Sequence, residues 1–271
     1  MVFKIGTMSV GDILDRGLKL LLARLPVFYA INLLVLLPAF LVEVFLAIVQ
    51  SREAVTPEQA LATAGSGFLA LLLAVILQPL GTAAILYIIS QEFVGSHPGI
   101  GEAFRFALRR FGALLGTSIL AGLAIGAGTL LCLIPGLIFS VWYIFVGQVV
   151  VVEALSGATA MTRSKSLSEG YRGRVWGMYA LFLAATFLLM GSVIGLAAIF
   201  PTQELVRTDT GQRIVHNLRN ELIQISIREL ISVVIQTYAA ICWTLLYFDL
   251  RIRKEGYDLE LAAREHASII S

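Results

Sequence analysis

The polar side chains inside apolar sequence are the first candidates for chemistry in this chain. Gln78, Gln148 and Gln236 each fall in a long apolar segment, roughly 9 to 11 residues from its start, or about 14 to 16 Å along a helix. An uncharged amide at that depth of a bilayer needs a hydrogen-bond partner. Two interpretations follow. The amides join neighbouring helices, or they form an intramembrane polar cluster that lines a path or holds a lipid headgroup, with Pro79 freeing a carbonyl beside Gln78.

Basic side chains form a second set, which could bind phosphate. They gather in three stretches that begin at Gly11, Gly101 and Gly157 and precede two long apolar segments each. At the start of the first stretch, Ser9 and Asp12 have the spacing of a capping box. At a membrane surface each basic residue contributes about 1 kcal/mol to binding anionic lipid. The candidates for binding lipid or a partner protein are Arg16, Lys19, Arg105, Arg109, Arg163, Lys165, Arg172, Arg251 and Arg253. The alternative is that each stretch only anchors the helices that follow and fixes their orientation.

No arrangement of residues indicates an enzyme. The three histidines have no cysteine or carboxylate at metal-ligand spacing, and no phosphate-binding loop, nucleophile elbow or dinucleotide motif occurs. Asp249 with Arg253, and Arg251 with Glu255, stand four residues apart, which is typical of structural ion pairs on a helix. We therefore expect no catalytic residue, no cofactor and no metal ion.

Long apolar segments must position all of these side chains. Of the 271 residues, 58% are hydrophobic and 14% are charged, and the net charge is +2. This composition indicates a membrane protein and gives no basis for nucleic-acid binding. Because backbone amides in lipid must be paired internally, and no alternating barrel pattern occurs, we predict an all-α integral membrane protein. Six segments have about the ~20 residues that cross a bilayer: 25–50, 67–91, 111–133, 137–153, 175–200 and 227–248.

The spans are expected to form three hairpins in a pseudo-threefold repeat. Each hairpin follows a cytoplasmic, amphipathic, interfacial helix, and the short turn Ile134-Pro135-Gly136 makes the third and fourth spans antiparallel. Fifteen of the 20 basic residues fall on the side of the two termini, which places both termini in the cytoplasm. We predict one membrane domain, 1–271, with repeat units 9–91, 99–153 and 157–248 and a cytoplasmic tail, 249–271.

Three further expectations concern packing and the outer side. Glu43 falls near the far end of the first span and should reach water. The connection 201–226 has apolar residues at helical spacing and should lie on the surface or continue into the sixth span. Small residues recur four apart, which predicts close helix packing within the chain or in a homodimer: Gly112, Gly116, Ser118, Gly122, Gly126, Gly191 and Gly195.

Two passages carry a family resemblance. The stretch 134–175 contains Ile134-Pro135-Gly136, Glu153, Arg163-Ser164, Leu167 and Gly170, and the stretch 245–260 contains the run from Tyr247 to Leu259. They resemble the glycerophosphoryl diester phosphodiesterase membrane-domain family of prokaryotic multi-pass proteins. The resemblance implies a six-helix bundle in a bacterial or archaeal cytoplasmic membrane. It does not imply hydrolysis, because catalysis in that family belongs to a separate soluble domain.

Three classes of function follow from these observations. The favoured one is a non-enzymatic multi-pass module that acts as a scaffold, an assembly subunit or a lipid-binding partner. Its expected partners are anionic headgroups on the cytoplasmic side and a protein partner or a second copy of the chain. The alternative is a transporter or lipid translocator that uses a polar bundle centre. The third is a membrane-embedded enzyme, for which Glu153 and Asp249 would be the residues to test.

Overall fold

Six helical segments are long and apolar enough to cross a membrane. The computed structural model describes residues 6–51, 57–93, 95–208 and 211–256. Within this described part, the candidate spans are Leu25–Val49, Val75–Glu92, Ile100–Leu131, Leu133–Glu153, Arg172–Ile199 and Leu218–Glu255. The predicted class, a helical multi-pass membrane protein, is confirmed.

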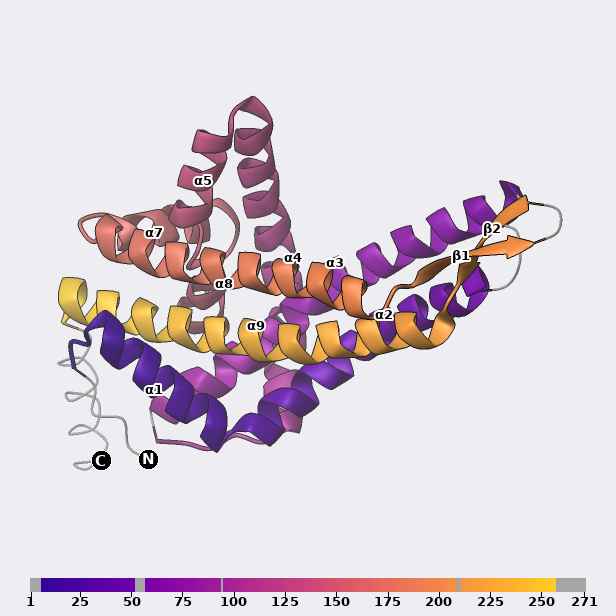
Figure 1. Cartoon of the computed structure of the whole chain (residues 1–271). Helices are drawn as coiled ribbons and strands as arrows, with labels where there is room; N and C mark the ends of the chain where they lie inside the picture. The colour runs from indigo at the N-terminus through magenta and orange to yellow at the C-terminus, as the bar shows by residue number, and fades with distance from the viewer. Residues whose placement is uncertain (1–5, 52–56, 94, 209–210, 257–271) are drawn as a thin grey trace. The chain divides into compact units, whose positions relative to one another are not determined.

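The elements follow one another in a nearly all-helical order (Figure 1). They are α1 (Val10–Ala23), α2 (Leu25–Ser51), α3 (Pro57–Phe93), α4 (Ile100–Leu131), α5 (Leu133–Trp142), α6 (Val146–Gln148), a π-helix (Val149–Glu153), α7 (Gly157–Ser168), α8 (Arg172–Ile199), β1 (Gln203–Thr208), β2 (Gly211–His216) and α9 (Leu218–Glu255).

The chain divides into two compact units, which we describe separately. Unit 1 comprises residues up to Ile31, the stretch Pro79–Phe182 and the residues from Thr237 onwards. Unit 2 comprises Asn32–Gln78 and Leu183–Gln236. The long helices α2, α3, α8 and α9 therefore each contribute one part to each unit.

The helix α1 begins with the predicted capping box. Ser9 Oγ accepts a hydrogen bond from the backbone N–H of Asp12 at 3.1 Å, and Asp12 Oδ2 accepts one from the N–H of Ser9 at 2.8 Å. The apolar face of α1 packs on α9, where a Cβ added to Gly17 would lie 2.8 Å from Cys242 Sγ. Glycine at this position therefore allows the two helices to approach closely. This face of α1 is covered by protein, which the sequence did not predict.

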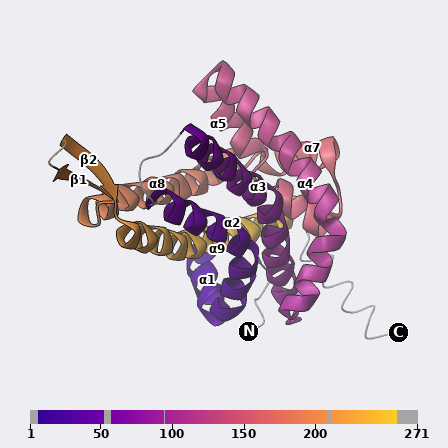
Figure 2. The ribbon, with the colours of Figure 1, turned by 90° about the vertical axis from the view of Figure 1, so that its right-hand side faces the viewer.

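The second basic stretch is not a separate interfacial helix. Residues 101–111 form the N-terminal part of α4, which runs for 32 residues without interruption. No proline or cap divides it, so the helix of the third span starts at Ile100. The predicted antiparallel hairpin of the third and fourth spans is confirmed, since α4 and α5 lie side by side (Figures 1 and 2). A Cβ at Gly136 would lie 2.8 Å from the backbone Cα of Thr129, so only glycine fits there.

The fourth span is broken in the middle. Helix α5 ends at Trp142, and the chain resumes as the short α6 and the π-helix. The break leaves backbone groups without helical partners, and Ser164 of α7 supplies them: its Oγ donates to the carbonyl of Trp142 at 2.7 Å and accepts from the N–H of Phe145 at 3.1 Å. Buried backbone groups must be paired. Helix α7 therefore has to pack against the break, so that Ser164 can bond to both groups.

The core of unit 1 surrounds this break and the end of α9. Its largest fully buried side chains come from α1, α2, α3, α7, α8, α9 and the break itself: Ile13, Phe28, Ile31, Leu86, Ile88, Ile89, Phe145, Leu167, Met178, Ile241, Leu245 and Tyr247. Elsewhere the spans keep apolar side chains exposed, including Leu130 (90%) and Ile194 (73%). An apolar outer surface is what a surrounding bilayer requires.

The helical prediction for 201–226 is wrong for its first half. β1 and β2 pair in an antiparallel hairpin whose register runs from Gln203↔His216 to Thr208↔Gly211. Ile214 and Val215 therefore lie in a strand and not in a helix. The second half is right, because α9 begins at Leu218 and continues into the sixth span.

The glycine repeats do not mediate close packing within the chain. At Gly112, Gly116, Gly122, Gly126, Gly191 and Gly195, an added Cβ would meet no described atom within 4 Å. These faces of α4 and α8 have no packed neighbour there, so the intramolecular prediction is wrong. The homodimer stays a prediction.

Candidate functional site

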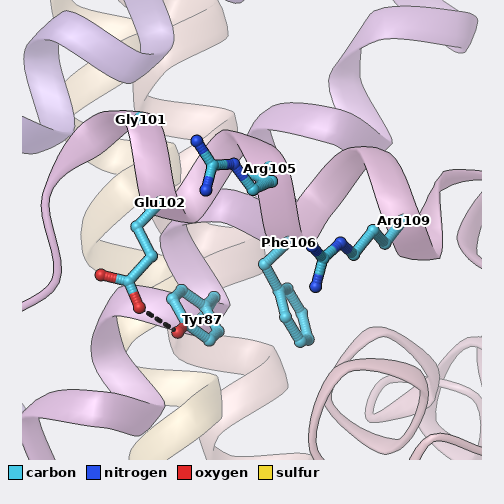
Figure 3. A pocket seen from close by; sticks show the side chains of 6 residues that line it. All are labelled: Tyr87, Gly101, Glu102, Arg105, Phe106 and Arg109. Atoms are coloured by element: carbon cyan, nitrogen blue, oxygen red, sulfur yellow. Dashed lines mark hydrogen bonds between the residues drawn. The ribbon is translucent and has the colours of Figure 1, made fainter.

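A pocket beside the start of α4 collects the polar groups best suited to a ligand. We call it the basic pocket; its volume is about 560 Å³. Figure 3 shows Tyr87, from α3, facing side chains of α4. The pocket is lined by Tyr87, Gly101, Glu102, Arg105, Phe106 and Arg109. All of them belong to unit 1.

Aromatic stacking and one hydrogen bond organise the basic pocket. The rings of Tyr87 and Phe106 are stacked, with centroids 4.3 Å apart and planes at 19°. The hydroxyl of Tyr87 donates to Glu102 Oε1 at 2.8 Å. These contacts fix the carboxylate and leave its second oxygen to accept another hydrogen bond.

The two arginines of the basic pocket have no partner among the residues that the structure describes. Arg105 and Arg109 are exposed and stand one helical turn apart, and neither forms an ion pair or hydrogen bond with any residue that the structure describes. With Glu102 the pocket carries a net charge of +1. Its position in the first turns of α4 adds the partial positive charge of unpaired backbone N–H groups. Guanidinium groups in such surroundings are suited to phosphate oxygens.

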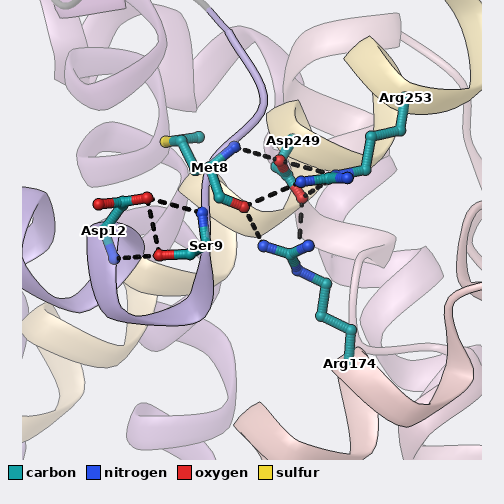
Figure 4. A network of polar contacts seen from close by, with 6 residues as sticks. All are labelled: Met8, Ser9, Asp12, Arg174, Asp249 and Arg253. Carbon is teal, nitrogen blue, oxygen red and sulfur yellow. Dashed lines mark hydrogen bonds and ion pairs between the residues drawn. The ribbon is translucent and has the colours of Figure 1, made fainter.

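Several other arginines of unit 1 are paired with carboxylates. We call the first such group the Asp249 cluster (Figure 4). The carboxylate of Asp249 is fully buried and accepts the N–H of Met8 at 2.7 Å and the Nε–H of Arg253 at 3.0 Å. Arg174 lies 3.4 Å from the same carboxylate, and both arginines donate to the carbonyl of Met8. This cluster ties the N-terminal segment to the start of α8 and the end of α9.

The second group, the Glu153 cluster, joins the π-helix, α7 and α9. Arg163 donates from Nε to Glu153 at 2.7 Å and pairs with Glu255 at 2.5 Å. The hydrogen bonds to Glu255 and Glu153 raise the pKa of the Arg163 guanidinium above its ordinary value, although burial opposes the shift. Tyr247 donates to Glu153 at 2.7 Å, and Arg251 pairs with Glu255 at 3.1 Å. The helical pairs predicted for Asp249 with Arg253 and for Arg251 with Glu255 are both present.

The other candidate basic residues are dispersed over unit 1. Lys19 pairs with its neighbour Asp15 at 2.6 Å on the exposed side of α1. Arg16 is half-buried on the same helix. Lys165 lies over the ring of Trp142, 4.3 Å from its centroid, and the exposed Arg172 stands 3.8 Å from Glu169. Of the nine basic candidates, Arg105 and Arg109 line one pocket together.

Two of the three glutamines meet. Gln78 Nε2 donates to Gln236 Oε1 at 3.2 Å, within unit 2. Gln148 belongs to unit 1, where it is buried in α6. The observed bond is the helix-joining contact of the first interpretation.

The two bonded glutamines line a groove of about 350 Å³ in unit 2. We call it the carboxylate groove. The sequence did not predict its central feature, in which Arg228 of α9 pairs with Glu43 of α2 and, at 3.3 Å, with Glu229. Glu43 was expected only to reach water; its carboxylate also holds Arg228. In the sequence, Glu43 and Arg228 carry opposite charges. They lie at similar distances from the C-terminal end of α2 and from the N-terminal end of α9.

Glu92 is a further buried carboxylate, which the sequence pattern did not indicate. Glu92, whose side chain is only 5% exposed, pairs with Arg24 and, at 2.9 Å, with Nδ1 of His97. It stands at the end of the second span, and no periodicity marked it.

The described residues contain no group of three histidines, cysteines or acids that could hold a metal ion. Comparison of the sequence and structure with protein families, curated proteins and solved structures finds no match.

Proposed function

We propose that this chain is a non-enzymatic multi-pass membrane module that binds anionic phospholipid headgroups in the basic pocket. The observation that carries the proposal is that Arg105 and Arg109 are exposed in one pocket and neither forms an ion pair with a described residue. An unpaired guanidinium beside a bilayer attracts lipid phosphate. In this role the chain serves as a scaffold or assembly subunit held by specific lipids in a prokaryotic cytoplasmic membrane.

The shape of the basic pocket supports a phosphate with a hydroxylated headgroup. The two guanidinium groups can donate to phosphate oxygens, and the second oxygen of Glu102 can accept from a hydroxyl beyond the phosphate. Tyr87 and Phe106 offer an apolar surface next to them. A glycerol-phosphate headgroup combines these features, so phosphatidylglycerol is the probe that we choose.

The distribution of charge supports an orientation with both termini in the cytoplasm. Fifteen of the 20 basic residues flank the spans on the side of the termini, and the basic pocket belongs to that side. We extend the proposal to the three basic stretches, in α1, at the start of α4 and in α7, as a threefold set of elements at the cytoplasmic surface.

The family resemblance supports a module without catalysis of its own. The residues that carry it include Glu153, Ser164 and Asp249, and each has a contact that holds elements of unit 1 together. Their partners are other protein groups, which gives them a structural explanation.

The test is lipid affinity in a pair of charge-matched variants. Native mass spectrometry in mild detergent gives the affinity for phosphatidylglycerol. Arg105→Gln with Arg109→Gln should weaken it by at least about 2 kcal/mol, or roughly 30-fold, because each hydrogen bond between charged groups contributes about 1.5–3 kcal/mol. Lys19→Gln with Arg172→Gln removes the same charge outside the pocket and should leave affinity within about threefold. Equal losses in both variants would show surface attraction without a pocket.

A second candidate function, lipid translocation, is supported by the carboxylate groove. The groove places an ion pair and the Gln78–Gln236 bond along candidate spans, where polar groups often mark a path. Reconstituted vesicles with a fluorescent phospholipid test it. Movement between leaflets that Gln236→Leu abolishes would support translocation, and no movement above protein-free vesicles would reject it.

A further inference from the structure

The carboxylate groove carries an imbalance of charge inside apolar surroundings. Glu43, Arg228 and Glu229 all fall within candidate spans, and they sum to a net charge of −1. Arg228 Nη2 forms ion pairs with both carboxylates. Because the groove is otherwise lined mainly by apolar side chains, its excess negative charge favours a cationic ligand over a neutral one.

Two carboxylate oxygens are open toward a ligand. Arg228 engages Oε2 of Glu43 and Oε1 of Glu229. The other oxygen of each carboxylate has no partner among the described residues, although both side chains line the groove. Each can accept a charge-assisted hydrogen bond.

The rest of the groove is apolar and continues along the helices. Arg228, Ser232 and Gln236 are spaced four apart on α9 and share one face. The facing wall is formed by aliphatic and aromatic side chains of α2 and α8, including Phe40 and Met190. A ligand here needs a polar head at Glu43 and Glu229 and a hydrocarbon part beyond it.

We propose that the carboxylate groove binds a phospholipid with a primary-ammonium headgroup, of the phosphatidylethanolamine type. The ammonium donates to the open oxygens of Glu43 and Glu229 and supplies the missing positive charge. The lipid phosphate lies against Arg228, and an acyl chain follows the apolar wall. This groove is independent of the basic pocket, which lies in the other unit and carries the opposite charge.

Native mass spectrometry with two lipids of identical chains tests this assignment. Phosphatidylethanolamine has N–H donors, and phosphatidylcholine has none. Wild type should bind phosphatidylethanolamine at least about 10-fold more tightly, as expected for hydrogen bonds to a charged group. Glu229→Gln keeps the shape of the side chain and removes the excess charge, and it should reduce this preference below about threefold.

Two controls separate this proposal from the basic pocket and from misfolding. Arg105→Gln with Arg109→Gln should leave the preference intact; loss of the preference there would place the ammonium in the basic pocket and overturn the inference. Met190→Trp fills the groove from an exposed position, 59% exposed, and should abolish the preference even where Glu229→Gln does not fold. Equal binding of the two lipids by wild type, or an unchanged preference in Met190→Trp, would also overturn it.

Discussion

Two groups of arginines in unit 1 differ in what surrounds them. In the Asp249 cluster, Arg174 and Arg253 share a fully buried carboxylate and a backbone carbonyl. In the basic pocket, Arg105 and Arg109 are exposed and no described carboxylate pairs with them. The same residue type therefore holds helices together in one place and faces a cavity in the other.

Partners, rather than charge alone, therefore determine the role of a basic residue in this protein. A buried guanidinium that lost its carboxylate would be costly, so such pairs are fixed parts of the fold. An exposed guanidinium beside the bilayer is free to exchange water for lipid phosphate.

The largest effect is expected from Asp249→Ala. The change leaves Arg174 and Arg253 without their carboxylate and the N–H of Met8 without its acceptor. Removal of one partner from a buried ion cluster should lower the free energy of unfolding by about 3–5 kcal/mol. Unfolding in mixed detergent measures it. Glu169→Gln, which alters an exposed pair at 3.8 Å, is the control and should change it by less than about 1 kcal/mol; similar losses in both would contradict the comparison.

A smaller effect is expected where the structural group is neutral. Ser164→Ala leaves the carbonyl of Trp142 and the N–H of Phe145 unpaired in a buried break. The expected loss of unfolding free energy is about 2–3 kcal/mol, with lipid affinity unchanged. Ser166→Ala on the same helix, whose hydroxyl bonds only within α7, should lose less than about 1 kcal/mol. If the two losses are equal, the bridge across the break does not stabilise unit 1.

The smallest effect concerns an exposed carboxylate. Hydrogen bonds from the side chain and backbone of Ser9 lower the pKa of Asp12 below its ordinary value of 3.8. A lowered folded-state pKa stabilises above the unfolded pKa, and this contribution is lost as the pH falls through the folded pKa. Wild type should therefore be slightly more stable than Asp12→Asn at neutral pH, and the difference should shrink as the pH falls below the ordinary pKa of 3.8 and through the lowered folded-state pKa. In a Ser9→Ala background the difference should shrink. A difference that grows on acidification would contradict the cap.

Local features of the fold were predictable from the sequence. Apolar length gave the six spans, Pro135 and Gly136 gave the hairpin of α4 and α5, and Ser9 with Asp12 gave the start of α1. Each depends on neighbouring residues in the chain, such as run length, turn chemistry or a capping box. The two helical ion pairs of α9 belong to the same class, since four-residue spacing alone predicts them.

Contacts between distant segments were not predictable in the same way. Arg163 and Arg109 look alike in sequence, and only the fold brings Glu153 and Glu255 to the first. The hairpin at 203–216 was missed because a few apolar residues fit a strand and a helix equally well. Glu43 and Arg228 are 185 residues apart in the sequence, so their pairing depends on how α2 and α9 pack together.

Two double variants separate stabilisation of the fold by the Asp249 cluster from lipid binding by the basic pocket. Both are measured for unfolding free energy and for phosphatidylglycerol affinity. Arg105→Gln with Arg109→Gln should lose roughly 30-fold in affinity, because their hydrogen bonds to phosphate are lost, and should keep the stability of wild type. Arg174→Gln with Arg253→Gln should lose at least about 3 kcal/mol of stability, while the folded fraction keeps wild-type affinity. These roles are wrong if the first pair of changes destabilises the protein as much as the second, or if the second pair lowers lipid affinity as much as the first.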